Sequence, residues 1–411
     1  MAEAASSSGA GGTTLLLILP LPIYRDGDRR WIDRQAHNGI ARWLDNFDRV
    51  ILCQPALPHS HAPADSRPID DADFDGRCRL VDLPDARSLG AFLKVLRLTI
   101  ARIDRLIDES THLSFAIGGL FGDWAAVAAL RAAHKHRKAS IWTDRVESQV
   151  TLLSAQRMTG LRRAYWTATA LAMRHYERHV IRRSAVGLFH GADCFTAYSP
   201  FSPDPHLVHD IHLSESARIT AEELQAKAAR RSGPLSIVYA GRVHPDKGPL
   251  DWIDALHLLH TRGVDFRATW HGDGPQFELA QAKVRELDLA SCVDFPGASQ
   301  DRDGLMRRLR AADLFLFCHK TPESPRCLIE ALISGTPIVG YGSSYSRDLI
   351  AHHGGGVLTE QQPAELADRI EQLATNREQL SNLIVAAARD GHPFTDVSVF
   401  HHRSELIKAI A

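Results

Sequence analysis

Short runs of apolar residues alternate along the chain with longer segments in which apolar residues recur every three to four positions. The short runs predict buried strands, and the wider spacing predicts helices. In the first half, strands are predicted at 15–19, 49–53, 113–117, 139–143 and 187–190, with helices at 123–136 and 160–183. In the second half, the predicted strands are 235–240, 266–271, 292–295, 314–319 and 337–341. Helices are predicted between and after them at 249–262, 275–289, 304–312, 325–334, 344–352, 363–375 and 377–389.

Strand–helix alternation of this kind is typical of parallel βαβ units. Two such series predict an α/β protein with two doubly wound, Rossmann-like domains that face one another across a cleft. We expect a disordered N-terminus (1–12), a first domain (13–198), a linker (199–232), a second domain (233–392) and an amphipathic C-terminal segment (393–411). The length of 411 residues suits two domains of this size.

Composition narrows the functional classes. Lys and Arg number 48 against 49 Asp and Glu, which disfavours a generally basic nucleic-acid-binding protein. No apolar run reaches the roughly 18–20 residues that span a bilayer, and the apolar residues 14–19 lack the flanking signals of a signal peptide. Six scattered cysteines without a Cys-x-x-Cys pair favour reduced thiols in the cytoplasm over a disulfide framework or a zinc site. The 22 histidines show no metal-binding spacing.

The segment Gly241-Arg-Val-His-Pro-Asp-Lys-Gly248 follows a predicted buried strand. It places Arg242 and Lys247 on one loop at the carboxyl end of that strand. Arginine as a forked donor and lysine as a point charge suit a diphosphate. The alternative is a solvated loop that carries two unrelated charges.

The segment His271-Gly-Asp-Gly-Pro275 occupies the equivalent position after the next strand. Gly272 and Gly274 lack side chains where a ligand could approach the backbone. The alternative is a tight turn that needs glycine only for its dihedral angles. The spacing is not Gly-x-Gly-x-x-Gly, so a dinucleotide site is not supported.

A third element runs from Lys320 to Val339. Ser324 is placed to cap a helix that starts at Pro325, and the start of such a helix favours phosphate or an oxygen-rich sugar. Glu323 and Glu330 are candidate acceptors for vicinal hydroxyls. The alternatives are a solvated Glu323 and a Glu330 on a helix surface, although Glu330 has apolar neighbours on both sides.

Together the three elements resemble the donor-binding domain of GT-B glycosyltransferases, specifically the retaining glycosyltransferase family 4 (glycosyl transferases group 1). The resemblance covers about residues 233–390. The positions that match the family pattern are Gly241, Arg242, Lys247, Gly248, Gly272, Gly274, Glu330 and Gly335-Thr-Pro337. It implies that Arg242 and Lys247 hold the diphosphate and that Glu330 binds the ribose hydroxyls.

One segment departs from the family pattern. Glu323 lies seven positions before Glu330, where the family has eight, and Glu-Ser-Pro-Arg326 replaces Glu-Gly-Phe-Gly. We assign Glu323, Ser324 and Arg326 to the donor through a shifted loop, with Glu323 at the sugar.

The resemblance implies transfer of a hexose from a nucleotide diphosphate sugar to a glycan or lipid-linked acceptor, with retention of configuration and without a metal or other cofactor. It further implies a role in cell-surface polysaccharide biosynthesis and a final helix that crosses back to the first domain. Two alternatives stay open. One is a sugar-nucleotide epimerase of the same architecture, and the other is a catalytically silent subunit that binds nucleotide sugars.

In the first half, Asp144 ends the predicted strand 139–143. It is a candidate acceptor contact or proton acceptor, and the alternative is a strand-end Asp beside Arg145. A second candidate is His37. The loop after the preceding strand is Gly118-Gly-Leu-Phe-Gly122, where many members of the family have a histidine.

Residues 130–185 hold twelve Lys and Arg against three Asp and Glu, a local formal charge of +9. Its core is a set of arginines with aromatic residues among them: Arg157, Arg162, Arg163, Tyr165, Trp166, Arg174, Tyr176, Arg178, Arg182 and Arg183. A basic helix with aromatic residues is typical of contact with an anionic membrane, which predicts a cytoplasmic protein at the inner face of the membrane. The alternative is a solvated helical hairpin. No nucleic-acid recognition motif accompanies the patch.

Overall fold

The computed structural model describes residues 12–63, 66–156, 158–299, 301–321 and 324–410. The predicted disordered segment 1–12 lies outside them except for Gly12. The contacts within the chain divide it into two compact units. Unit 1 comprises Met1–His212 and Phe400–Ala411, and unit 2 comprises Leu213–Val399.

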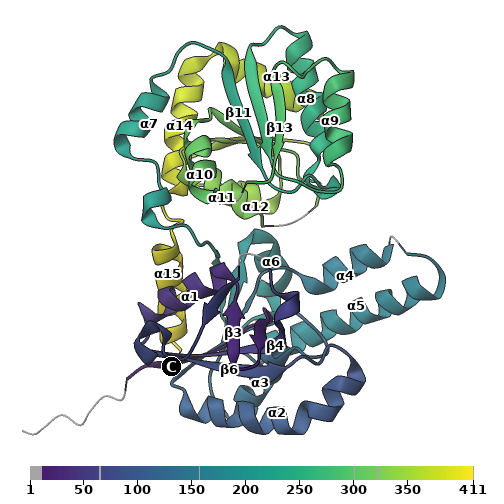
Figure 1. Ribbon diagram of the computed structural model, residues 1–411, viewed down its shortest axis with the longest axis vertical. Helices are drawn as coiled ribbons and strands as arrows, with labels where there is room; N and C mark the ends of the chain where they lie inside the picture. The colour runs from purple at the N-terminus through teal and green to yellow at the C-terminus, as the bar shows by residue number, and fades with distance from the viewer. Residues whose placement is uncertain (1–11, 64–65, 157, 300, 322–323, 411) are drawn as a thin grey trace, which may run out of the picture. The chain divides into compact units, whose positions relative to one another are not determined.

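Unit 1 is built on one ten-stranded sheet (Figure 1). Its strands are β1 (Thr14–Ile18), β2 (Ile23–Asp26), β3 (Arg29–Ile32), β4 (Arg49–Pro58), β5 (Arg67–Ile69), β6 (Cys78–Pro84), β7 (His112–Ala116), β8 (Ser140–Thr143), β9 (Val186–His190) and β10 (Pro205–Val208). Their order is β10-β9-β8-β7-β1-β4-β2-β3-β5, and β6 also pairs with β4. The β2–β3 and β3–β5 pairs are antiparallel and the others are parallel.

The parallel part of this sheet is doubly wound. From the buried central strand β1 the chain adds β4 and β6 on one side, and then β7, β8, β9 and β10 on the other. The direction of winding reverses between β1 and β7. Ligands of such sheets bind at the carboxyl ends of the strands near this switch point.

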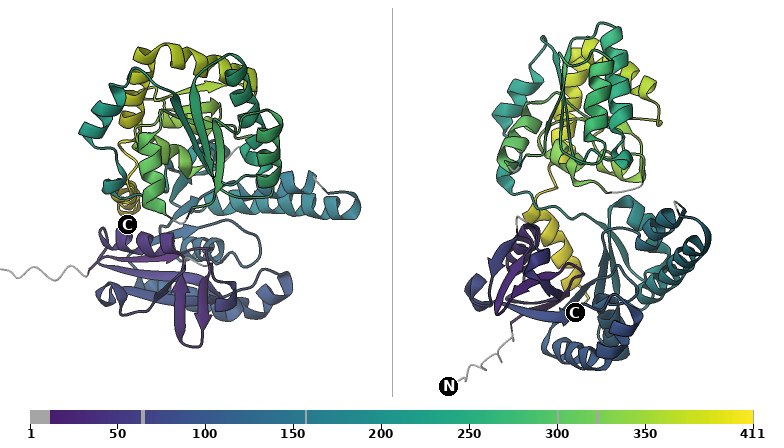
Figure 2. Two further views of the ribbon diagram at one scale, coloured as in Figure 1. Left: turned by 45° about the horizontal axis from the view of Figure 1, so that its top comes forward. Right: turned by 45° about the vertical axis from the view of Figure 1, so that its right-hand side comes forward.

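The helices of unit 1 cover the sheet and also extend beyond it. They are α1 (Arg34–Leu44), α2 (Leu89–Glu109), α3 (Trp124–His134), α4 (Glu147–Gln156), α5 (Gly160–Ile181) and α6 (Gly191–Tyr198). Helices α4 and α5 pack against each other and form a hairpin that extends away from the sheet (Figures 1 and 2).

The last helix, α15 (Asp396–Lys408), contributes residues from Phe400 onward to unit 1. Phe400 and Ile407 are buried in the same hydrophobic core as Ile40 and Trp43. The predicted packing of the C-terminal segment against the first domain is therefore seen at these residues. Val397, on the same apolar pattern, is 44% exposed.

Several elements of unit 1 differ from the prediction. The antiparallel pair β2–β3 is closed by the two-residue turn Gly27–Asp28, with Gly27 at a φ of 59°. The sequence of this pair is polar, so the hydrophobic pattern does not predict its strands. Strand β6 and helix α2 were also missed. Residues 199–212, predicted as linker, belong to unit 1, and β10 within them pairs with β9.

Unit 2 contains a six-stranded, fully parallel sheet. Its strands are β11 (Leu235–Ala240), β12 (Phe266–His271), β13 (Val293–Gly297), β14 (Leu314–Phe317), β15 (Ile338–Tyr341) and β16 (Gly356–Thr359). The order β13-β12-β11-β14-β15-β16 is the Rossmann order, with its switch point between β11 and β14.

Helices lie on both faces of this sheet (Figures 1 and 2). They are α7 (Ala221–Ala228), α8 (Pro249–Thr261), α9 (Phe277–Glu286), α10 (Arg302–Ala311), α11 (Arg326–Ile333), α12 (Ser344–Leu349), α13 (Pro363–Thr375) and α14 (Arg377–Gly391). Helices α8, α9 and α13 lie on one side in Figure 1, and α7, α10 and α14 on the other. The predicted α/β class with two Rossmann-like sheets is confirmed.

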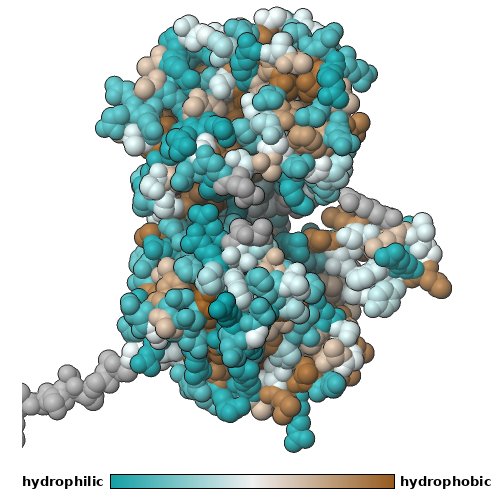
Figure 3. All heavy atoms as spheres, in the orientation of Figure 1, coloured by the Kyte–Doolittle hydropathy of each residue, from teal (hydrophilic) through white to brown (hydrophobic). Residues whose placement is uncertain are grey.

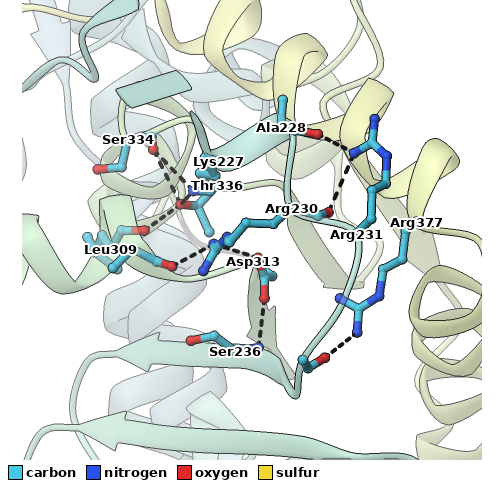
Figure 4. Close-up of polar contacts among 12 residues, drawn as sticks. Lys227, Ala228, Arg230, Arg231, Ser236, Leu309, Asp313, Ser334, Thr336 and Arg377 are labelled. Atoms are coloured by element: carbon cyan, nitrogen blue, oxygen red, sulfur yellow. Dashed lines mark hydrogen bonds and ion pairs between the residues drawn. The ribbon is translucent and has the colours of Figure 1, made fainter. Parts of the chain in front are cut away.

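A polar cluster joins α7 to the segments that precede β14 and β15 (Figure 4). The buried Lys227 donates to Thr336 Oγ1 at 2.6 Å and to the Ser334 carbonyl at 3.4 Å. Nearby, Arg230 Nη2 lies 2.7 Å from Asp313 Oδ1. Burial holds the pKa of Lys227 well below its usual value. These contacts lie at the amino ends of the strands, so they support the sheet on the edge away from the predicted donor loops.

Candidate functional site

The loop after β11 is compact. Pro245–Lys247 form a 3-10 turn, and α8 follows directly. Gly248 has a φ of 64°, and a Cβ there would overlap the carbonyl of Cys318. The loop leaves Arg242 exposed, whereas Lys247 is only 9% exposed. The two cations therefore differ in their contact with solvent.

Backbone hydrogen bonds join this loop to the loop after β12. Gly241 N donates to the carbonyl of His271 at 2.9 Å, and Val243 N donates to that of Asp273 at 2.9 Å. A Cβ on Gly272 would overlap the carbonyl oxygen of Gly241. The indole of Trp270 donates to the same oxygen at 3.0 Å. Glycine is thus required at 272 for two loops to lie in contact.

The loop after β14 joins the other side of the β11 loop. Lys320 N donates to the carbonyl of Asp246 at 2.9 Å. Lys320 Nζ also lies 2.6 Å from Asp251 Oδ1, and Asp251 Oδ2 accepts from the Tyr341 hydroxyl at 2.9 Å. Three loops that follow β11, β12 and β14 are therefore bonded into one surface.

His319 lies beneath this surface. It is 8% exposed, and its Nε2 is 2.8 Å from the Tyr239 hydroxyl. Burial, and to a lesser extent the charge of Lys247, hold the pKa of His319 well below its usual value. The ring is thus neutral near pH 7, which leaves the positive charge at this place to Lys247.

Helix α11 begins at Arg326, with Pro325 at the cap position and no side-chain cap. The prediction that Ser324 caps a helix starting at Pro325 is therefore corrected by one residue. Glu330, in the second turn, is 6% exposed, and its Oε1 lies 2.5 Å from Nη2 of Arg302. Glu323 lies outside the described residues.

A cavity of about 550 Å³ lies between α10 and strands β11–β13. Its polar lining includes His271, Asp294, Ser299 and Arg308. Burial, and then the charge of Arg308, lower the pKa of His271. The cavity adjoins the donor loops at His271 and Gly297, although its chemistry does not single out a ligand.

In unit 1, Asp144 is exposed just after β8, at the carboxyl edge of the sheet. Its neighbour Arg145 pairs with Glu147 at 2.6 Å. After the adjacent β7, the carboxylate of Asp123 accepts from the backbone N–H groups of Gly118 and Gly119 at 3.0 and 2.9 Å. Burial nevertheless raises the pKa of Asp123.

His37 lies in the first turn of α1, which Asp33 caps. Its ring centroid is 5.0 Å from that of Phe74. Burial, and then the charge of Arg67, lower the pKa of His37. The ring thus packs against Phe74 and is not on the loops after β7 and β8 that carry Asp123 and Asp144.

The basic region maps to the α4–α5 hairpin, and the structure separates its arginines into two groups. Arg178 and Arg182 lie over the ring of Phe201, with Cζ 4.3 and 4.9 Å from its centroid. Arg162, Arg163, Arg174 and Arg183 are exposed, and so is Arg182 despite its contact with Phe201. Arg157 lies outside the described residues.

Apolar side chains accompany the exposed arginines. Leu161 is 91% exposed, Tyr165 65% and Leu171 48%, and Figure 3 shows hydrophobic surface on this hairpin. Leu161 and Tyr165 lie one helical turn apart on α5, whereas Met173 and Glu177 of the same helix are buried. None of the helices in the described part of the chain could span a bilayer.

Most of unit 2 matches a family of known proteins. Residues 220–390 match the family model of glycosyl transferases group 1. The chain is 25% identical over 182 residues to a 2-deoxystreptamine N-acetyl-D-glucosaminyltransferase from Niallia circulans, covering 44% of each chain. It is 26% identical over 186 residues to an amylovoran biosynthesis glycosyltransferase from Erwinia amylovora, covering 43% of this chain and 46% of the relative. The chain thus aligns with less than half the length of these two relatives.

A solved structure extends the likeness to both units. The structure of HepE from Anabaena, in complex with UDP, superposes with a TM-score of 0.66 at 16% identity. It covers 97% of this chain and 100% of its own. The fold is that of GT-B glycosyltransferases. The family match and this fold together support a GT-B glycosyltransferase.

The structure brings together Gly241, Lys247 and Gly272 through the bonded loops. It shows Arg242 on the same loop as Lys247, and Glu330 on the helix that follows the β14 loop. Sequence reasoning missed Arg302. The predicted helix begins at 304, which leaves Arg302 outside it, whereas in the structure Arg302 is the first residue of α10.

Proposed function

We propose that this protein is a retaining glycosyltransferase. It transfers a hexose from a nucleotide diphosphate sugar to a glycan or lipid-linked acceptor in cell-surface polysaccharide biosynthesis. The observation that carries the proposal is the surface formed by three bonded loops at the carboxyl edge of the unit 2 sheet, with Arg242 and Lys247 upon it. The UDP complex of HepE and the amylovoran relative support the donor and the pathway class.

In this proposal Arg242 and Lys247 bind the diphosphate and stabilise the negative charge that develops on it as the glycosidic bond breaks. The backbone N–H groups at the start of α11 add positive potential. Glu323 contacts the sugar, Ser324 and Arg326 also contact the donor, and Glu330 accepts from the ribose hydroxyls.

The acceptor hydroxyl attacks from the same face that the diphosphate leaves, which retains the configuration of the sugar without a covalent intermediate. Asp144 contacts the acceptor and takes its proton. Because two cations and a helix start already face the diphosphate, we propose that no divalent metal is required. Turnover should persist in excess EDTA, and its loss with recovery on adding Mn²⁺ would overturn this part.

Membrane contact is a further part of the proposal. Leu161 and Tyr165 enter the headgroup region, while Arg162, Arg163 and Arg174 pair with anionic lipids, each contributing about 1 kcal/mol. Scattered cysteines fit the cytoplasmic side of the membrane. Glu177, the one acid on α5, does not weaken this attraction at the surface, since it is buried against Ser148.

The membrane contact is tested by sedimentation with vesicles of phosphatidylglycerol and phosphatidylcholine. Wild type should bind at low salt and dissociate as salt rises. Changing Arg162, Arg163 and Arg174 together to Gln should abolish binding, whereas Arg307→Gln in unit 2 should not. Equal binding of both variants would contradict the assignment to α5.

The donor site is tested by calorimetry with UDP, ADP and GDP. Lys247→Ala and Arg242→Ala should each weaken binding of the preferred nucleotide by about 1.5–3 kcal/mol, which is the scale of a charged hydrogen bond. Arg262→Ala is the control, because Arg262 lies at the far end of α8 and pairs with Asp368 and Glu371. Unchanged affinity in both site variants would remove the central assignment.

Turnover distinguishes the remaining alternatives. A retaining transferase releases the nucleoside diphosphate and forms a product whose anomeric configuration matches that of the donor, which NMR can follow. An epimerase would convert the donor sugar without any acceptor. A silent binding subunit would bind the donor and convert nothing.

A further inference from the structure

Glu330 is an acidic residue on a largely buried helix. It is 6% exposed, and the residues on either side of it, Leu328, Ile329, Ala331 and Leu332, are fully or almost fully buried. A buried carboxylate is costly unless it is paired and hydrogen-bonded. Arg302 supplies that partner, with Nη2 2.5 Å from Oε1 of Glu330.

Arg302 occupies an unusual position for a cation. It is the first residue of α10, which Asp301 caps by accepting from Gly304 N at 2.7 Å. The positive end of the helix dipole disfavours an arginine there. Helix α10 itself therefore gains nothing from Arg302, and the contact that accounts for the side chain is the one to Glu330.

The geometry of the pair leaves the carboxylate able to bind a ligand. Among the described residues, the hydrogen bond to Glu330 is made through Oε1, and a carboxylate has two oxygens with about four acceptor positions. A guanidinium on one oxygen fixes the plane of the carboxylate. The other oxygen can then accept from a hydroxyl.

The start of α10 is also tied to the donor loops. Gly272 N donates to the carbonyl of Gly297 at 3.1 Å, and Gly297 ends the strand that leads to Asp301 and Arg302. Gly297 therefore lies against the loop that contacts Gly241, and Arg302 starts α10 five residues later. The ion pair joins the start of α10 to α11.

We propose that Arg302 is a positioning residue that orients the carboxylate of Glu330 toward the ribose hydroxyls of the donor nucleotide. This inference rests on the proposed function, and it adds a specificity determinant for ribose. Arg302 acts through Glu330 and not by contact with the diphosphate. Its effect should therefore depend on the ribose hydroxyls and not on the phosphate charge.

The test is calorimetry with UDP and 2′-deoxy-UDP on the full chain. Wild type should prefer UDP by roughly tenfold, the scale of a hydrogen bond to a charged group. Arg302→Ala should weaken binding of UDP by about tenfold and binding of 2′-deoxy-UDP much less. The ratio of the two affinities should therefore approach one. Arg302→Lys, which keeps the charge, should retain part of the preference.

Two matched variants complete the design. Arg307→Ala removes an exposed arginine from the same helix and should leave both affinities unchanged. Glu330→Gln should lower the ribose preference, and adding Arg302→Ala to it should cause little further loss, because the two side chains act as one unit. Circular dichroism checks that each variant is folded.

Three results would overturn the inference. If Arg302→Ala keeps the wild-type preference for UDP, Arg302 has no role in ribose recognition. If Arg302→Ala binds UDP more tightly, the guanidinium competes with the ribose for Glu330. If the losses in the double variant add fully, the two side chains act independently. Failure of the proposed function is distinct, since wild type would then bind none of UDP, ADP and GDP.

Discussion

Phe400→Ala tests whether the C-terminal helix is part of the unit 1 core. Phe400 is 2% exposed, and its ring is 5.0 Å from that of Trp43 in an edge-on arrangement. The ring of His212 lies 5.6 Å away, and Cζ of Arg403 lies 5.3 Å from the Phe400 centroid. The substitution removes all of these contacts at once.

The magnitude follows from the burial. Replacing a buried Phe by Ala costs about 3–5 kcal/mol through lost transfer energy and the cavity that remains. Unit 1 has 224 residues. At that size, 1 kcal/mol shifts the melting temperature by roughly 2–4 °C, so a cost of about 4 kcal/mol predicts a shift of roughly 8–16 °C.

The assay is differential scanning calorimetry with and without a saturating nucleotide. Phe400→Ala should lower the transition of unit 1 by the amount above. The nucleotide should still raise the other transition, because the proposed donor site lies in unit 2. Val397→Ala is the matched control, since Val397 lies one turn earlier on the same helix and is 44% exposed.

The reasoning would be refuted if Phe400→Ala and Val397→Ala had the same melting profile. That result would mean that the aromatic contacts around Phe400 contribute little. A shift confined to the transition that responds to nucleotide would also contradict it. The helix would then stabilise unit 2 and not unit 1.

Three further predictions concern single side chains. Gly272→Ala should abolish nucleotide binding in calorimetry, because its Cβ would push the β11 and β12 loops apart; Gly354→Ala, whose Cβ would meet nothing within 4 Å, controls for a left-handed glycine elsewhere in unit 2. Burial raises the pKa of Glu177, so wild type should lose stability as pH rises from about 4.5, and Glu177→Gln should not; equal slopes in denaturation titrations would contradict this. Burial lowers the pKa of Lys227, so wild type should gain stability as pH rises toward about 10.5, and Lys227→Met should lack that gain.

The strands of unit 2 could be predicted closely from the sequence. Strands β11 and β12 match the predicted 235–240 and 266–271 to the residue. Their side chains are mostly buried between two layers of helices, so they form short apolar runs bounded by glycine. Strand β16 was missed, because it is a short edge strand with only one fully buried residue.

Unit 1 was predicted less completely, for a physical reason. Strands β2 and β3 carry the charged residues Arg25, Asp26, Arg29 and Arg30 in place of a hydrophobic pattern. Arg25 and Arg30 both pair with Asp82. Helix α2 has mostly exposed or half-buried residues in its first half. Local polarity hides elements whose stability comes from partners far along the chain.

The candidate site also contains residues that the sequence pattern indicates and residues that it does not. Arg242, Lys247 and Glu330 could be named as candidates from the sequence, because residue type and strand-end position together suggest phosphate and hydroxyl binding. Arg302 was not found, because its role depends on a partner 28 residues away. The hydrogen bonds that join the loops could not be predicted either, because they are formed by backbone groups and do not depend on the type of side chain.

Those backbone bonds determine which part of this site can be transplanted. The β11 and β12 loops donate backbone hydrogen bonds to each other in both directions. The β14 loop adds the hydrogen bond from Lys320 N to the β11 loop. Grafting one loop alone into another GT-B protein would leave unpaired backbone amide groups where the loops meet. The smallest exchangeable module is therefore the three loops together, whereas outward-facing side chains such as Arg242 can be replaced one at a time to alter donor choice on an unchanged backbone.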